Sequence, residues 1–172
     1  MLYVSKSLDL GICIVSIDGD FSKINKTYKS SEFLSKQYPA IAVIPEDRKI
    51  FTCDIPVFQG KNSITSLFDT AIQKTKTEWA FVVFAGSVIK KRIDNKLSMY
   101  VENKHDVLFP VVNRIYNFID GSMNGILINK HFYEEVGEFG TGNSLADTKI
   151  YWADRALQKG VKFKAIVNAC NI

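Results

Sequence analysis

The sequence predicts an α/β protein in which a mostly parallel β-sheet is flanked by helices. The first observation is an order of strand, helix and strand over residues 11–45, which forms a βαβ unit and implies parallel strands. The second is the segment from Trp79 to Phe84, which is entirely apolar and typical of a strand buried on both faces. A chain of 172 residues is most simply a single domain, 1–172, with a substantial core.

The first half of the chain contains apolar runs separated by turn and helix signals. The expected elements are a strand and turn over 11–20, a helix over 21–39, a strand over 40–47, an extended segment over 49–60 and a helix over 62–76. Ser22 is the candidate N-cap of the first helix, and Pro39 ends it. Asn62 or Ser63 caps the second helix, whose apolar residues share one face.

The second half continues the alternation of strands and helices. The expected elements are a strand over 79–84, a short helix over 93–104, an extended segment over 106–120, a strand over 125–129, a short helix closed by Gly137, a helix over 145–159 stopped by Gly160, and a last strand. Pro110 indicates an edge or a bend in the extended segment. Asp120-Gly121 and Asn124-Gly125 are turn signals.

Composition argues against several classes of protein. The formal net charge is +4, and the basic residues are scattered among acids, so we expect no nucleic-acid partner. Three unevenly spaced cysteines and two histidines argue against a disulfide framework or a metal cluster of these residues. The N-terminal stretch has no long apolar run, which predicts neither a signal peptide nor a membrane span and therefore a cytoplasmic protein.

Three stretches of the chain resemble the nucleotide-sugar-binding domain of family-two, GT-A-fold glycosyltransferases. "SITSLFDTAIQKTKTEWAFVVFAGSVI" resembles the family's helix and the strand that closes in Asp-x-Asp. "NGILINKHFYEEVGEF" resembles its strand, short helix and "vGgF" loop, and "GNSLADTKIYWADRALQKGVKFKAI" its Glu-Asp pair and the helix after it. The likeness covers about 40–166 and implies a short, Rossmann-like GT-A fold that binds a nucleotide sugar.

The chain departs from this family where a metal would bind. The family's acidic triplet falls at Phe84-Ala85-Gly86, or one position later, and neither register contains a carboxylate. In the family these acids hold a divalent cation against the diphosphate, because Mg²⁺ and Mn²⁺ prefer oxygen ligands. We therefore expect no metal cofactor. The neutral tip Ala85-Gly86-Ser87 is still expected to contact the nucleotide sugar.

The resemblance assigns roles to several further residues. Asp147 would be the general base on the acceptor hydroxyl, although Ala146 replaces its glutamate partner. Positions that would contact the donor are Asp18 or Asp20 at the first strand's tip, Glu46 and Asp47 after the second strand, and Asp69, where the family has asparagine. Lys90, Lys91 and Arg92 could neutralise the diphosphate in place of a metal.

Each of these candidates also has a structural interpretation. Asp147 would stabilise a helix N-terminus by its charge alone, and Asp18 and Asp20 would suit a turn that bonds to its own backbone. A run of basic residues is usually a solvated surface. Trp79 and Trp152 are expected in the core or a pocket wall.

Three functions remain open from the sequence. The first is a glycosyltransferase that uses a nucleotide-sugar donor and, without a metal, inverts the anomeric carbon in a single displacement. The second is a catalytically inactive GT-A-like module for binding or assembly. The third is an unrelated α/β module that shares topology alone, since a fold does not fix a function.

Overall fold

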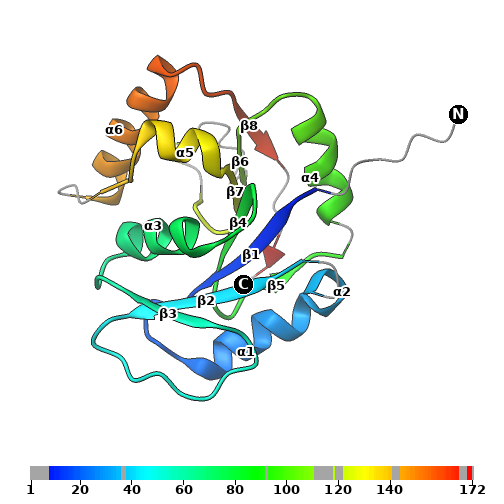
Figure 1. Ribbon diagram of the computed structural model, residues 1–172, viewed down its shortest axis with the longest axis vertical. Helices are drawn as coiled ribbons and strands as arrows, with labels where there is room; N and C mark the ends of the chain where they lie inside the picture. The colour runs from blue at the N-terminus through cyan, green and yellow to red at the C-terminus, as the bar shows by residue number, and fades with distance from the viewer. Residues whose placement is uncertain are drawn as a thin grey trace, which may run out of the picture.

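The computed structural model describes residues 8–35, 38–91, 93–110, 118, 122–140, 144–166 and 170–171 (Figure 1). The strands are β1 (Leu10–Val15), β2 (Ala40–Pro45), β3 (Val57–Gly60), β4 (Trp79–Phe84), β5 (Val88–Ile89), β6 (Val107–Pro110), β7 (Ile126–Asn129), β8 (Phe163–Ile166) and β9 (Cys170–Asn171). The helices are α1 (Phe21–Ser30), α2 (Glu32–Ser35), α3 (Ile64–Lys74), α4 (Ile93–Glu102), α5 (Lys130–Val136) and α6 (Leu145–Gln158).

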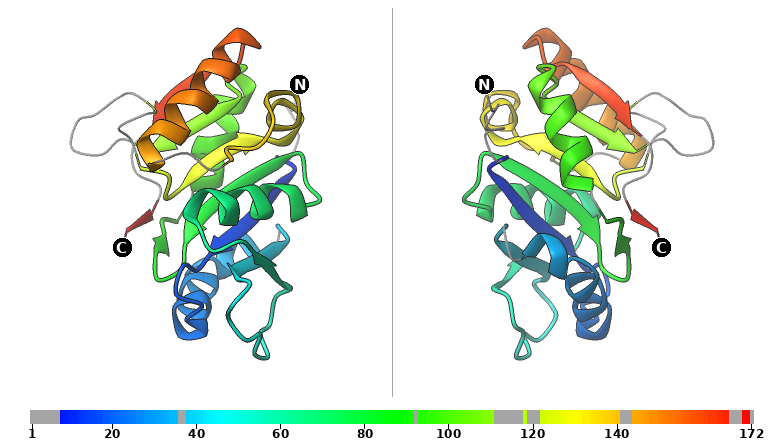
Figure 2. Two further views of the ribbon diagram at one scale, coloured as in Figure 1. Left: turned by 90° about the vertical axis from the view of Figure 1, so that its left-hand side faces the viewer. Right: turned by 90° about the vertical axis from the view of Figure 1, so that its right-hand side faces the viewer.

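One seven-stranded sheet organises the molecule, in the order β3-β2-β1-β4-β7-β6-β8. It is mostly parallel, because only β7 runs against its two neighbours within the described strands. The predicted α/β class is therefore confirmed. Figure 2 shows β1 and β4 running side by side. Their carboxyl ends point toward the end of the sheet where β5 pairs with β9.

Helices cover both faces of this sheet and divide the core into two parts. Helices α3, α5 and α6 pack on one face, and α1, α2 and α4 on the other (Figure 1). Strand β4 alternates between the two cores, with Ala80 and Val82 in the first and Trp79, Phe81 and Val83 in the second. This confirms that β4 is buried on both faces, as its unbroken apolar sequence predicts.

Both tryptophans belong to the core. Trp152, only 1% exposed, stacks at 4.6 Å between ring centroids on Phe139, and its indole N–H donates to the carbonyl of Gly137 at 2.8 Å. Trp79 begins β4 and is 4% exposed. Because the indole N–H of Trp152 has a partner, burying this large ring leaves no donor unsatisfied.

Several boundaries differ from those predicted. The helix expected over 21–39 is two helices, since α1 ends at Ser30 and α2 starts at Glu32. The N-cap of α1 is Asp20 rather than Ser22, whereas Ser63 does cap α3. Pro110 is the last residue of β6, which lies inside the sheet rather than at its edge.

Some predicted features lie outside the described residues: the segment 111–117, the turn at Asp120-Gly121, and Arg92. The short sheet of β5 and β9 was not predicted, since two-residue strands leave no periodic pattern. Among the described helices, none combines the length and the apolar character needed to cross a membrane.

The close approach of β1 to the α3–β4 connection requires a glycine. A Cβ atom at Gly11 would lie 2.5 Å from the hydroxyl oxygen of Thr77, and it would also collide with the hydroxyl of Thr75. Both threonines are buried, and their hydroxyls are bonded to each other at 3.0 Å. The side chain that is missing at Gly11 is therefore what lets this loop pack against β1.

We expect Gly11→Ala to destabilise the protein by roughly 1–3 kcal/mol, because the extra methyl group overpacks a tight contact. Urea unfolding measures the change in free energy. Combining it with Thr75→Ala, which removes one of the colliding hydroxyls, should cost less than the sum of the single changes. Strict additivity would contradict the proposed collision.

Candidate functional site

A pocket of about 350 Å³ opens beyond the carboxyl ends of β1 and β4. These neighbouring strands form the switch point of the sheet, because the chain leaves β1 toward β2 on one side of the pair and leaves β4 toward β6 and β7 on the other side. Open α/β sheets bind ligands at this position. The pocket is lined by Val15, Ser16, Ile17, Asp18, Lys23, Phe84, Ala85, Ser87 and Asn124.

The chain leaving β4 is tied to α1 by hydrogen bonds. The backbone N–H of Gly86 donates to the hydroxyl of Thr27 at 2.9 Å, and that hydroxyl donates to the carbonyl of Ser87 at 2.8 Å. The N–H of Ile89 donates to the hydroxyl of Ser30 at 3.1 Å. Gly86 has φ +95°, a conformation that favours glycine and turns the chain toward α1.

Asn124 fixes the tip of β4 from the other side. Its side-chain oxygen accepts from the N–H of Phe84 at 2.8 Å, and its amide nitrogen donates to the hydroxyl of Ser87 at 3.0 Å. Asn124 and Ser87 are buried. The predicted tip Ala85-Gly86-Ser87 is thus held rigidly, and Ala85 and Ser87 line the pocket.

Asp18 and Lys23 bring the pocket its charged groups. The ammonium of Lys23 forms an ion pair with Oδ2 of Asp18, and both side chains are 49% exposed. Oδ1 of Asp18 accepts from the hydroxyl of Ser16 at 3.0 Å and from the N–H of Asp20 at 3.1 Å. The bond from Lys23, with the backbone bond from Asp20, lowers the pKa of Asp18 to about 2.

Asp20 has a structural role beside the pocket. Its Oδ1 accepts from the N–H of Ser22 at 2.8 Å and from the N–H of Lys23 at 3.4 Å, so it caps α1. The bond from the Ser22 hydroxyl, at 2.7 Å, is the main cause of its lowered pKa. Asp20 orients the first turn of α1, from which Lys23 reaches the pocket.

Glu46 and Asp47 lie on an exposed turn after β2 and do not line the pocket. The turn nevertheless adjoins the end of β1, because the side chain of Arg48 packs within 3 Å of where a Cβ atom of Gly19 would stand. Arg48 pairs with Asp47 at 3.7 Å. A donor contact by Glu46 or Asp47 stays a prediction.

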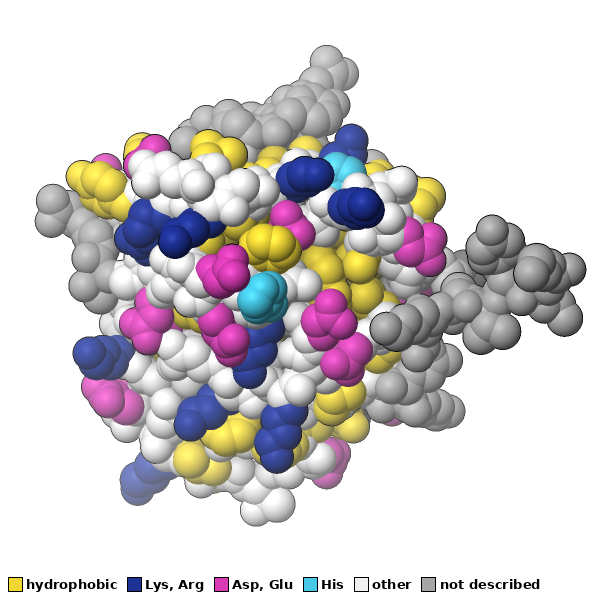
Figure 3. Space-filling view, turned by 45° about the horizontal axis from the view of Figure 1, so that its top comes forward, with side chains coloured by type: hydrophobic (Ala, Val, Ile, Leu, Met, Phe, Trp, Pro, Cys, Tyr) yellow, Lys and Arg dark blue, Asp and Glu magenta, His cyan; other side chains and the backbone are white. Residues whose placement is uncertain are grey.

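Lys90 and Lys91 follow β5 and are not among the described residues of the pocket wall. The structure instead brings Lys23 there, from a helix that is remote from them in sequence. The face drawn in Figure 3 mixes acidic, basic and hydrophobic side chains. A donor contact by Lys90 or Lys91 stays a prediction.

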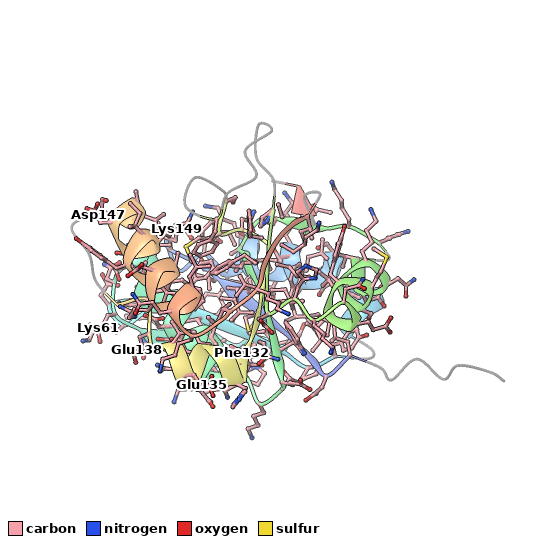
Figure 4. The ribbon with its side chains drawn as sticks, turned by 90° about the horizontal axis from the view of Figure 1, so that it is seen from above. Lys61, Phe132, Glu135, Glu138, Asp147 and Lys149 are labelled. Atoms are coloured by element: carbon pink, nitrogen blue, oxygen red, sulfur yellow. The ribbon has the colours of Figure 1, made fainter. Side chains whose placement is uncertain are left out.

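Asp147 lies in the first turn of α6, where its N–H donates to the N-cap hydroxyl of Ser144 at 3.1 Å. It does not line the β1–β4 pocket. Figure 4 shows Asp147 near the outer end of α6, on the side of the molecule where Lys61 and Glu138 also lie. The described residues thus do not place the candidate base in the same pocket as the β4 tip.

Asp69 is only 5% exposed and joins α3 to the loop after α5. Its Oδ1 accepts from the hydroxyl of Tyr133 at 2.6 Å and the N–H of Phe139 at 2.8 Å, and its Oδ2 from the N–H of Gly140 at 3.1 Å. Burial outweighs these bonds and raises its pKa. Asp69 borders a separate pocket of about 310 Å³ that Glu138 also lines, so its predicted donor contact stays untested.

The residues at the β4 tip do not fit the divalent cation that binds at this place in the resembled family. The one carboxylate on the described pocket wall, Asp18, is paired with Lys23, and the hydroxyl of Ser87 is bonded to Asn124. A hard cation needs several oxygen ligands. Within the described residues no three His, Cys, Asp or Glu side chains converge on one point.

Lys23, Ser16 and Asn124 were missed in the sequence. Lys23 could have been found, because it lies in the first turn of the helix that follows β1, near the sheet edge where ligands bind. Asn124 gave only a turn signal with Gly125. Its role depends on β7 running antiparallel to β4, a pairing between segments some forty residues apart.

Comparison with solved structures shows the fold. Residues 1–349 of TarS from S. aureus align with 94% of this chain and 58% of that one, with a TM-score of 0.65 and 12% sequence identity. The same protein in complex with UDP gives a TM-score of 0.64 at 8% identity, again over 94% and 58% of the two chains. Its complex with UDP-GlcNAc gives 0.61 at 9% identity, over 94% and 56%.

The chain spans a little more than half the length of these structural neighbours. Their similarity defines a GT-A-like fold, in agreement with the sequence resemblance. No protein-family model matches the chain. No curated protein sequence matches it either.

We expect Tyr133→Phe to destabilise the protein by roughly 1–3 kcal/mol, because it leaves buried Asp69 with one donor fewer. Since burial already holds the pKa of Asp69 above 3.8, the ionised form is the costly one. The deficit should therefore be small at acid pH and grow as the pH rises through the native pKa. Urea unfolding at several pH values measures it.

Tyr151→Phe is the matched control, since Tyr151 is 66% exposed on α6. It should change stability little at any pH. If the two variants behaved alike, the hydrogen bond from Tyr133 to Asp69 would contribute nothing to stability.

Proposed function

We propose that this protein binds a nucleotide sugar in the pocket at the carboxyl ends of β1 and β4. The observation that carries the proposal is that a GT-A-like fold has an open pocket at its switch point with a lysine on the wall. TarS, the glycosyltransferase with which the fold is shared, has been seen with UDP and with UDP-GlcNAc. These two complexes suggest a nucleotide or a nucleotide sugar as the class of ligand.

The pocket wall suits such a ligand chemically. Ile17, Phe84 and Ala85 offer apolar surface to a flat base or to the carbon face of a sugar. Lys23 offers an ammonium to the diphosphate. This positive charge would stabilise the negative charge of the diphosphate when it leaves the sugar. The ammonium of Lys23 thereby takes the place of the metal that the β4 tip cannot hold.

Transfer of the sugar is the second candidate function. Its support is Asp147, a partly exposed residue for whose carboxylate the described part of the chain supplies no hydrogen-bond or ion-pair partner. In transfer with inversion, this carboxylate would take the proton of an acceptor hydroxyl as the oxygen attacks the anomeric carbon. The attacking hydroxyl would have to lie within hydrogen-bond distance of Asp147 and beside the anomeric carbon at once, so the donor sugar would have to extend from the β1–β4 pocket toward the start of α6.

We expect UDP and UDP-GlcNAc to raise the melting temperature, and to do so equally with and without Mn²⁺. Lys23→Gln should weaken binding by roughly tenfold, because a charged hydrogen bond to phosphate is lost. Lys26→Gln, an exposed change one turn later on α1, should leave it unaltered. Calorimetric titration gives the affinities.

A panel of UDP, GDP, CMP and dTDP sugars tests the class of ligand. A shift with any of them that Lys23→Gln reduces supports the proposal. Silence across the whole panel, or an affinity that Lys23→Gln leaves unchanged, would refute the assigned pocket.

With water as the acceptor of the sugar, Asp147→Asn should abolish release of UDP from UDP-GlcNAc while leaving its affinity unchanged, because the base acts on the acceptor and not on the donor. Asp154→Asn, farther along α6 and bonded to Gln158, is the control. If the wild-type protein binds the donor but releases no UDP, the result supports nucleotide-sugar binding and contradicts sugar transfer.

A further inference from the structure

The ion pair of Asp18 and Lys23 fills the charged end of the β1–β4 pocket. Lys23 is the cationic side chain on the described pocket wall, and its ammonium is directed to Oδ2 of Asp18. The two residues come from different elements, the loop after β1 and the first turn of α1. The group best suited to bind an anion is therefore already bound to an anion.

The two partners are held to very different degrees. Oδ1 of Asp18 is fixed by the hydroxyl of Ser16 and the N–H of Asp20, so the carboxylate has a set position. Lys23 ends in a flexible four-carbon chain, and its ammonium has three protons to donate. The ammonium of Lys23 can therefore move away from Asp18 without disturbing the loop. The carboxylate of Asp18 cannot move away without breaking its bonds to Ser16 and Asp20.

Asp18 stays ionised under physiological conditions. The bond from Lys23 is the main reason that its pKa is near 2. At neutral pH an entering phosphate meets a carboxylate at the pocket wall as well as a lysine that is already paired. Both effects oppose an anionic ligand, the first by repulsion and the second by competition.

We propose that Asp18 is a built-in competitor in this pocket, and that a phosphate-bearing ligand binds by taking Lys23 from Asp18. The proposal rests on the proposed function for its ligand class, a nucleoside diphosphate or its sugar ester, and it adds a mechanism that sets the affinity. Before a ligand enters, the protein itself neutralises the lysine, and the diphosphate then replaces the carboxylate as the partner of Lys23.

Other charged groups near the pair define the controls. Asp20 caps α1 and also attracts Lys23, so changing it would disturb the helix. Glu46, Asp47 and Arg48 lie on the neighbouring turn, outside the pocket wall. Asp54 is an exposed aspartate outside the pocket wall, and Asp54→Asn, which removes one negative charge without touching the pair, is the matched control for Asp18→Asn.

Asp18→Asn is a mild substitution for this purpose. Asparagine keeps a side-chain oxygen that can accept from Ser16 and from the N–H of Asp20, while it loses the charge that holds Lys23. The turn after β1 should therefore keep its shape. Comparing melting temperatures of the variants checks that they are folded.

The experiment is calorimetric titration of inorganic pyrophosphate and of UDP into the wild-type protein and four variants without divalent metal. Asp18→Asn should bind both about threefold more tightly than wild type, the factor expected from releasing an exposed ion pair. Asp54→Asn should bind as wild type does. Lys23→Gln should bind weakly, and Asp18→Asn with Lys23→Gln should bind as weakly as Lys23→Gln alone.

The dependence on Lys23 distinguishes competition for this lysine from the nonspecific effect of removing a negative charge. Weaker or unchanged binding in Asp18→Asn would overturn the proposal, and so would tighter binding that persists without Lys23 or that Asp54→Asn reproduces. If pyrophosphate behaves as expected while no nucleotide sugar binds, the competitor stands and the proposed function fails. If nucleotide sugars bind and Asp18→Asn changes no affinity, the proposed function stands and the competitor role of Asp18 is wrong.

A measurement on the wild-type protein keeps the test independent of any variant's folding. The pKa of Asp18, followed by carbon NMR, should rise from about 2 toward its ordinary value of 3.8 when pyrophosphate saturates the pocket. An unchanged pKa at saturation would mean that Lys23 never leaves Asp18, and the proposal would be wrong.

Discussion

The parallel pairing of β1 with β4 is the constraint on which the rest of this structure depends. The two strands are in register from Leu10 opposite Trp79 to Val15 opposite Phe84, so they end at the same level of the sheet. Both are buried on their two faces, and helices on opposite faces connect them to the rest of the chain. A pocket at their common carboxyl end follows from the strand order, because the chain leaves β1 toward β2 on one side of the pair and leaves β4 toward β6 and β7 on the other.

What the pocket contains is decided by the segments that converge on this end. Helix α1 returns beside the β4 tip, where Thr27 binds the backbone at Gly86, and it delivers Lys23 to the wall. The turn before β7 delivers Asn124 from the other side. In place of a cluster of carboxylates, the site thus has a rigid neutral tip with one lysine on the described wall, whose charge is balanced by Asp18.

Residues transferred from a family resemblance kept their elements but not always their surroundings. Asp69 is on the predicted helix, yet all its described bonds hold Tyr133 and the backbone of 139–140. Asp147 is at the predicted start of α6, outside the β1–β4 pocket. The place of a residue on a helix or strand follows from the local sequence pattern. The hydrogen-bond partners of its carboxylate depend instead on which loops fold over it.

The sequence by itself determined the α/β class, the order of the main strands and helices, and the buried β4, because hydrophobic periodicity, caps and glycine stops are local signals. It also indicated that the β4 tip lacks acids. Only the tertiary structure decided that Asp20 caps α1, that Lys23 rather than Lys90 reaches the pocket, and that Asn124 orders the tip. These depend on contacts between segments distant in the chain, and such contacts leave no periodic mark in either segment.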